Sequence, residues 1–221
     1  MQKNNVAEQN YRKGIPMDKN LNCNAGKTKE KNEIDRIYSS IHGDKKYVFG
    51  EGNEYSGIVF IGEAPGADEE ASGHPFVGKA GKNLSAFLDT AHINRNDIYI
   101  TNAVKFRPVK INPKTNRASN RTPTTDEIIS YREWLLKELS VINPKLVVTL
   151  GNTPLFSVTG DKKLKISAVH GTISDYQNSR YSLNFKLMPF YHPAAIIYRR
   201  ELVVEYQNDM IKFAESVKNI L

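Results

Sequence analysis

Short apolar runs alternate with amphipathic helical patterns along most of this chain, and this alternation is the strongest constraint on its fold. The apolar runs predict strands at residues 57–62, 97–104, 145–150 and 187–191. Apolar residues spaced three or four apart predict helices at residues 33–42, 79–91, 126–141 and 202–220. Strands that alternate with helices form a parallel sheet with helices on both faces. We therefore predict an α/β fold, a three-layer αβα sandwich around a central four-stranded parallel sheet.

Two segments depart from the alternation. Residues 160–185 alternate weakly and contain Gly160, Gly171 and Asn178, which predicts a β-hairpin excursion. Residues 1–32 are polar and rich in Asn and Lys, with seven Lys or Arg against three acids. We predict a flexible basic tail over 1–32 and one folded domain over 33–221. The tail is either simply solvated or an auxiliary DNA-binding arm.

Composition excludes several classes of protein. One cysteine in 221 residues excludes an internal disulfide framework and any metal site built from several cysteines. The sequence has no run of 18 apolar residues that would span a membrane, and its start lacks the apolar core of a secretory signal. We expect a cytoplasmic protein, a monomer without a membrane partner. The 31 Lys and Arg against 24 acids give a net charge of +7, which permits a polyanionic partner.

Residues that follow the predicted strands are candidates for a site, because parallel sheets bind ligands beyond the carboxyl ends of their strands. After the first strand, five glycines and two prolines restrain the loop shape over residues 62–81. A plain turn would explain Gly62-Glu63-Ala64-Pro65-Gly66 alone, but explains the whole run less well. The glycine spacing is that of neither a dinucleotide fingerprint nor a P-loop, which disfavours a nucleotide site.

Two more polar side chains follow other strands. Asn102 ends the second strand, where it can cap the backbone or read a donor and an acceptor side by side. His192 follows the fourth strand and precedes Pro193, so it either braces a turn or lies near Glu63 in a site.

The loop over residues 105–121 contains six cations and no acid, and is either solvated or in contact with phosphates. The cations are Lys105, Arg107, Lys110, Lys114, Arg117 and Arg121.

The combination of these groups suggests a reaction type. The sequence offers a carboxylate, an amide, an aromatic ring, an imidazole and a basic rim. It shows no nucleophilic Ser or Cys with an adjacent base, and no multi-histidine metal spacing. A carboxylate that positions water and a histidine that stabilises an anion suit hydrolysis of a bond whose leaving group is an anion.

Five motifs in order identify a family resemblance: GEAPG, GHPFVGKAG, TNAVKFRP, LVVTLG and HPAA. Over roughly residues 45–218, the chain resembles the uracil-DNA glycosylase superfamily, and most of all its family four, the iron–sulfur type. The resemblance implies the uracil-DNA glycosylase-like αβα fold. It also implies excision of uracil from DNA in base excision repair, with uracil-containing DNA as partner.

The resemblance also implies a role for each matching residue. Glu63 would hold water and favour a cationic sugar, while His192 would stabilise the charge on uracil O2. Asn102 would bind the uracil edge, Phe76 would stack on the flipped base and Glu69 would lie near C5. Gly62 and Ala64 would border the substrate. The DNA contacts would come from the six loop cations and from Ala194, Ala195 and Ile196.

The chain departs from the family pattern at the cluster cysteines. Phe106 and Tyr131 occupy the third and fourth cysteine positions, and Cys23 has no cysteine partner. A [4Fe–4S] cluster therefore cannot form in the family manner, and we expect no cofactor and no metal, with aromatic packing in that volume. The HPAA motif lacks the hydroxyl and second proline of the family's HPSP-like motif. Residues 105–121 contain no histidine, which disfavours the covalent DNA cross-linking of one relative.

Two other functions remain open. One is a glycosylase of the same fold for another deaminated base, such as hypoxanthine or xanthine. The other is a non-catalytic nucleic-acid-binding module, which the presence of Glu63, Asn102 and His192 disfavours.

The single cysteine generates a direct test. We expect the purified protein to be colourless, without the broad visible absorbance of iron–sulfur charge transfer, and to contain no stoichiometric iron. Absorption spectroscopy and metal analysis on the same preparation check this, and about four irons per chain would contradict it.

Overall fold

A computed structural model describes residues 23–43 and 45–220, and the chain divides into two compact units, Met1–Lys45 and Lys46–Leu221. In the first unit, α2 (Cys23–His42) is one continuous helix. The helix predicted at 33–42 therefore begins earlier, and the expected boundary at residue 32 falls inside it. Residues 1–22 of the predicted tail lie outside the described residues.

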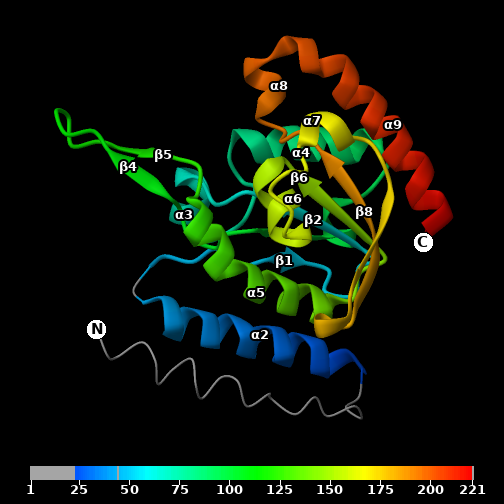
Figure 1. The fold of residues 1–221 in the computed structure, drawn as a ribbon, viewed down its shortest axis with the longest axis horizontal. Helices are drawn as coiled ribbons and strands as arrows, with labels where there is room; N and C mark the ends of the chain where they lie inside the picture. The colour runs from blue at the N-terminus through cyan, green and yellow to red at the C-terminus, as the bar shows by residue number, and fades with distance from the viewer. Residues whose placement is uncertain (1–22, 44, 221) are drawn as a thin grey trace. The chain divides into compact units, whose positions relative to one another are not determined.

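The second unit is built on a mostly parallel sheet (Figure 1). Among the described residues, six strands lie in the order β1-β3-β2-β6-β8-β7. They are β1 (Glu51–Gly52), β2 (Ile58–Gly62), β3 (Tyr99–Asn102), β6 (Leu146–Leu150), β7 (Ser174–Asn178) and β8 (Leu183–Phe190). The four central strands pair in parallel, and β1 and β7 add antiparallel edges. The predicted four-stranded parallel sheet is thus confirmed. Of the two edge strands, β7 falls within the hairpin predicted at residues 160–185, and β1 was not predicted.

Helices cover both faces of this sheet, as the alternation predicted (Figure 1). On one face, α4 (Lys79–Thr90) and α9 (Val203–Ile220) contribute Leu84, Phe87 and Phe213 to a buried core. On the other face, α5 (Thr125–Ile142) and α6 (Asn152–Thr159) contribute Leu135 and Leu155 to a second core. Burial of these apolar side chains provides the main stabilisation of the three layers.

Local signals explain where α5 begins and ends. The Thr124 hydroxyl accepts the N–H of Glu127, whose side chain accepts the N–H of Thr124, which forms a capping box at the start of α5. Asn143, with φ of 52°, ends this helix in the left-handed conformation. The short helices are α3 (Ala67–Ser72), η1 (Arg95–Asp97), α7 (Ile166–Val169), η2 (Ser179–Tyr181), α8 (Ala195–Tyr198) and η3 (Arg200–Leu202).

The segment 160–185 only partly follows its prediction. A loop and the short helix α7 come first, and the hairpin proper is β7 paired antiparallel with the first half of β8. β8 begins at Leu183 because Leu183 and Phe185 point inward while Asn184 is exposed, the alternation of a strand with one buried face.

The basic loop is also a hairpin, which was not predicted. β4 (Val109–Ile111) pairs with β5 (Ala118–Asn120), and this hairpin projects from the second unit (Figure 1). The Asn112 side chain accepts the N–H groups of Lys114 and Thr115, and Asn116 adopts φ of 52°, so the connecting turn is ordered.

Among the described residues, none of the helices has the length and apolar character that a membrane span requires.

Candidate active site

The carboxyl ends of the four parallel strands bring the predicted site residues to one edge of the sheet. Gly62 at the end of β2 lies opposite Asn102 at the end of β3, and Leu150 of β6 lies opposite Phe190 of β8. Glu63 directly follows β2, and His192 lies two residues after the end of β8. The strand ends therefore carry Glu63, Asn102 and His192 at the same edge.

Glu63 has two hydroxyl partners that the sequence did not reveal. The Thr153 Oγ1 donates a hydrogen bond of 2.7 Å to Glu63 Oε2, and the Thr122 side chain also hydrogen-bonds to this carboxylate. Burial raises the pKa of Glu63, and the two hydroxyls act against that rise because they stabilise the ionised form. The result is a desolvated carboxylate, fixed by its donors.

Asn102 and Phe76 pack closely around Gly62. Asn102 is 2% exposed, and a Cβ at Gly62 would collide with both the Asn102 Oδ1 and the Phe76 ring. Phe76 has φ of 56°, a conformation that non-glycine residues seldom adopt. A Cβ at Gly81 would collide with the Phe76 carbonyl oxygen. The glycines of the loop therefore allow Phe76 and the amide to approach the strand end.

Glu69 shapes the same loop from within. Its carboxylate accepts the N–H of Gly66 at 3.0 Å, and the N–H groups of Val77 and Gly78 at 3.1 and 2.8 Å. The side chain is buried, and its negative charge acts on His192. These contacts give Glu69 a loop-ordering role that the resemblance did not imply.

His192 is held as a neutral imidazole. Its Nδ1 accepts the N–H of Ala194 at 3.1 Å, which places the ring proton on Nε2. Burial lowers the pKa of His192 to about 4, and the charge of Glu69 opposes this shift. The ring stacks on Phe76 with 6.1 Å between centroids and 30° between planes. His192 is thus a hydrogen-bond donor that stays uncharged at neutral pH.

The residues after His192 form a compact turn. The N–H of Ala195 donates to the His192 carbonyl at 2.7 Å, and the Asn83 Nδ2 donates to the Pro193 carbonyl at 3.0 Å. Ala195 and Ile196 are partly buried and pack against the core beneath α4 and α9. Ala194 is also half-buried, so all three candidate DNA contacts keep some exposed surface at this edge.

The predicted basic rim divides into two groups, and Lys105 leaves it altogether. Lys105 is 3% exposed, and its ammonium donates to Glu138, so its expected place on a phosphate-contacting surface is wrong. Arg107 bonds to Glu70 at 3.1 Å, and Arg121 forms a bidentate pair with Glu127. Because these two cations are engaged by carboxylates, they brace the base of the hairpin.

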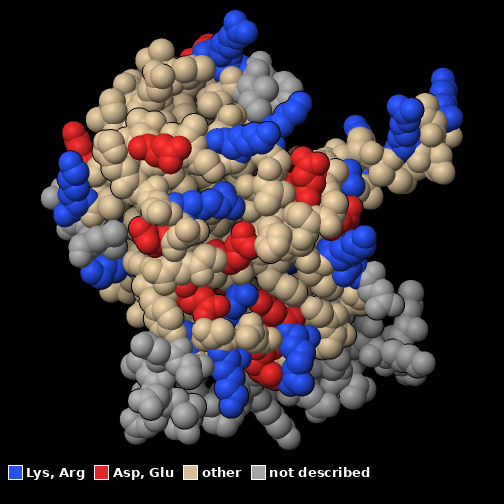
Figure 2. All heavy atoms as spheres, turned by 180° about the vertical axis from the view of Figure 1, so that it is seen from behind, with Lys and Arg blue, Asp and Glu red and all other residues tan. Residues whose placement is uncertain are grey.

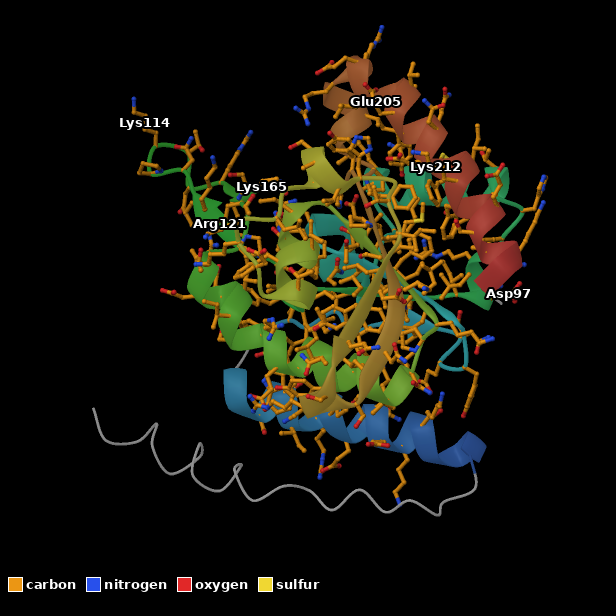
Figure 3. The ribbon with its side chains drawn as sticks, turned by 45° about the vertical axis from the view of Figure 1, so that its right-hand side comes forward. Asp97, Lys114, Arg121, Lys165, Glu205 and Lys212 are labelled. Atoms are coloured by element: carbon orange, nitrogen blue, oxygen red, sulfur yellow. The ribbon has the colours of Figure 1, made fainter. Side chains whose placement is uncertain are left out.

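The second group of cations lies on the hairpin itself. Lys110, Lys114 and Arg117 are exposed, and none forms an ion pair with another residue in the described part of the chain. Figure 2 shows Lys and Arg side chains at the end of the projecting hairpin, and Figure 3 shows Lys114 there with Arg121 at the base. This positive charge extends outward from the edge that carries the site.

Aromatic packing occupies two positions where the family resemblance would place cluster cysteines. The rings of Phe106 and Tyr131 lie 5.4 Å apart and are 7% and 3% exposed. Burial raises the pKa of the Tyr131 phenol, so it stays neutral. Neither side chain supplies a thiolate, and no group of three or more candidate ligands occurs among the described residues. These residues do not fit an iron–sulfur cluster.

In this three-layer αβα fold, the sheet carries a neutral histidine donor and a desolvated carboxylate at the carboxyl ends of its strands. A site of this class is suited to hydrolysis without a covalent nucleophile. Residues 49–218 match the family profile described as "Uracil DNA glycosylase superfamily". The chain belongs to this superfamily.

Several relatives carry the name type-4 uracil-DNA glycosylase. The protein from Archaeoglobus fulgidus is 40% identical over 172 residues, which cover 76% of this chain and 81% of the relative. The protein from Thermotoga maritima is 39% identical over 153 residues, 69% of this chain and 72% of the relative. The protein from Pyrobaculum aerophilum is 34% identical over 172 residues, 76% of this chain and 82% of the relative.

Thr153 was missed because a hydroxyl at the start of a helix usually caps that helix, and nothing in the sequence pairs it with Glu63. The Gly151 turn after β6 could have directed attention to it, by the same strand-end rule that found the other groups.

Replacement of Thr153 tests its effect on the carboxylate. In Thr153→Val, loss of the hydroxyl donor should raise the pKa of Glu63 further, because burial then acts with less opposition. Thr153→Ser keeps the donor and should stay close to the original protein. NMR titration of the Glu63 side-chain carboxyl measures the shift, and equal pKa values in the Val and Ser variants would contradict it.

Proposed function

We propose that this chain is a monofunctional uracil-DNA glycosylase that hydrolyses the N-glycosidic bond of deoxyuridine in DNA. It frees uracil and leaves an abasic site, the entry to base excision repair. The observation that carries the proposal is the neutral His192, whose Nδ1 accepts a backbone N–H so that Nε2–H is the donor, at the same sheet edge as a desolvated Glu63. The type-4 relatives support the same reaction.

His192 and Glu63 stabilise opposite charges that develop in the transition state. The C1′–N1 bond breaks and its electron pair stays with uracil, where the His192 Nε2–H stabilises the negative charge on O2. A neutral donor suits this task because it stabilises the anion without first having to lose or gain a proton. The Glu63 carboxylate stabilises the cationic sugar and holds the water whose oxygen bonds to C1′, and it accepts the proton that this water releases.

Recognition requires the base to leave the DNA stack. The Phe76 ring offers a stacking surface, and the Asn102 amide offers one donor and one acceptor to the uracil edge. The backbone of Gly62 and Ala64 borders this space. Glu69 acts here through the loop that it orders around Phe76, and its carboxylate near C5 would disfavour the methyl group of thymine.

The hairpin cations Lys110, Lys114 and Arg117 supply phosphate contacts, and Ala194, Ala195 and Ile196 supply apolar contacts at the flipped nucleotide. Arg107 and Arg121 contribute by bracing the hairpin. We also propose that the protein acts as a monomer in the cytoplasm; size-exclusion chromatography with light scattering tests the oligomeric state.

A labelled oligonucleotide with one uracil tests the function, with alkaline cleavage at the abasic site as the readout. Matched strands with thymine, hypoxanthine or xanthine at that position serve as comparisons. We expect cleavage only of the uracil strand. Preferential release of hypoxanthine or xanthine would assign another glycosylase activity, and binding without any release would indicate a non-catalytic module.

The roles of Glu63 and His192 predict separate defects. Glu63→Gln and His192→Asn should each lower the single-turnover rate by about 10²-fold or more, with DNA affinity and melting temperature little changed. His192→Asn is chosen because its side-chain oxygen can still accept the Ala194 N–H while the Nε2–H donor is lost. If His192 only braces the Pro193 turn, the rate survives this change and His192→Ala lowers the melting temperature instead.

The hairpin predicts a loss of affinity that is independent of DNA sequence. Changing Lys110, Lys114 and Arg117 together to Gln should weaken binding to all duplexes alike. The slope of log affinity against log salt should flatten by about 0.9 for each phosphate that the variant no longer neutralises. Titrations at several salt concentrations measure this slope. Changing the exposed Lys145, Lys212 and Lys218 to Gln removes the same charge elsewhere; an equal effect of this control would rule out a specific role for the hairpin.

A further inference from the structure

A buried ion pair between Lys105 and Glu138 contacts the backbone of Asn102, where the turn after β3 meets α5. Lys105 and Glu138 are 3% and 2% exposed. The Lys105 ammonium donates to Glu138, to the Thr101 hydroxyl and, at 2.8 Å, to the main-chain carbonyl of Asn102. Glu138 also accepts from the hydroxyls of Thr101 and Tyr99, at 3.1 and 2.8 Å. The network therefore joins α5 to the backbone of Asn102 itself.

The same turn is tied to the catalytic side of the sheet. The N–H of Ala103 donates to the Gly62 carbonyl at 2.9 Å, and the N–H of Val104 donates to the Glu63 carbonyl at 3.1 Å. One side of the turn is thus anchored on the end of β2, and the other side is anchored on Glu138 through Lys105. The position of the Asn102 backbone depends on both anchors.

Stability alone gives little reason to retain such a pair. Removing two charges from water is costly, and apolar side chains of similar size often stabilise a protein equally well or better. Lys105 and Glu138 are too deeply buried to contact DNA or substrate. What the pair does contact is the carbonyl of Asn102, whose amide side chain packs against Gly62 and Phe76.

We propose that the Lys105–Glu138 pair is a positioning element that sets the orientation of the Asn102 amide toward the base edge. The inference rests on the proposed function and deepens it. A backbone shift of about 1 Å can cost roughly 10²-fold in rate when it misaligns a group that must meet a substrate. The buried charges therefore serve base recognition, although neither touches the base.

The test variant is Lys105→Met combined with Glu138→Gln. The glutamine oxygen still accepts from the hydroxyls of Tyr99 and Thr101, and no buried charge is left unpaired, so the melting temperature should stay close to the original. The single-turnover rate of uracil excision should fall about 10- to 100-fold. An unchanged rate in the folded double variant would overturn the proposal. Asp175→Asn with Lys186→Met is the matched control. It removes an exposed ion pair between β7 and β8, at the other end of the strand order from β3, and should keep the full rate.

A double-mutant cycle separates positioning from a general loss of structure. If the pair acts through the Asn102 amide, adding the two changes to Asn102→Ala should cause little further loss, because that amide is already absent. A further loss as large as in the original background would overturn the proposal. Affinity for an oligonucleotide without uracil should be unchanged in all variants, since both residues of the pair are buried.

A second variant keeps the test decisive if the double variant does not fold. Thr101→Val is nearly isosteric and removes the bridging hydroxyl while the ion pair remains. It should lower the rate several-fold and show the same non-additivity with Asn102→Ala; additive losses would again overturn the inference. Failure of the proposed function is distinguishable, because the unmodified protein would then release no uracil at all.

Discussion

The register of the parallel strands is the constraint on which the site depends. Gly62 lies opposite Asn102, and Thr149 lies opposite both Ile61 and Pro189. Because successive side chains point to opposite faces of a sheet, a slip of one residue in β3 would turn the Asn102 amide away from Phe76. The turn after β3 holds this register by donating two backbone hydrogen bonds to the end of β2. The fold therefore determines the chemistry through strand ends and not through any one motif.

Burial then acts on the two reactive groups in opposite directions. It raises the pKa of Glu63 and lowers the pKa of His192. In both cases burial favours the neutral form of the side chain. In the proposed mechanism Glu63 carries a negative charge that stabilises a cationic sugar, and the hydroxyls of Thr153 and Thr122 favour that ionised state. His192 needs no such help, since the neutral ring is the useful donor. The asymmetry of partners around the two groups matches the asymmetry of their proposed roles.

Sequence reasoning found the elements whose signals are local and missed those that depend on a distant partner. Apolar spacing predicted α5 to within one residue at each end. The strand-end rule likewise singled out Glu63, Asn102 and His192, which the structure places at the same edge of the sheet. Lys105 was assigned to a charged surface because the sequence gives its charge but not its partner, Glu138, which lies on a helix later in the chain. The hairpin was read as a loop because its two strands are three residues each and carry little apolar alternation.

The contacts at the base of the hairpin involve two of the predicted cations, Arg107 and Arg121. Phe106 precedes β4 and Tyr131 lies on α5, so their ring contact joins the segments on either side of the hairpin. Apolar contact of this kind is not directional, and it fixes a separation better than an orientation. The bidentate pair of Arg121 with Glu127 is directional, and it holds the pKa of Glu127 at about 2. The Arg121–Glu127 pair thus orients the base of the hairpin, and the exposed positive charge of Lys110, Lys114 and Arg117 lies in the residues within and between its two strands.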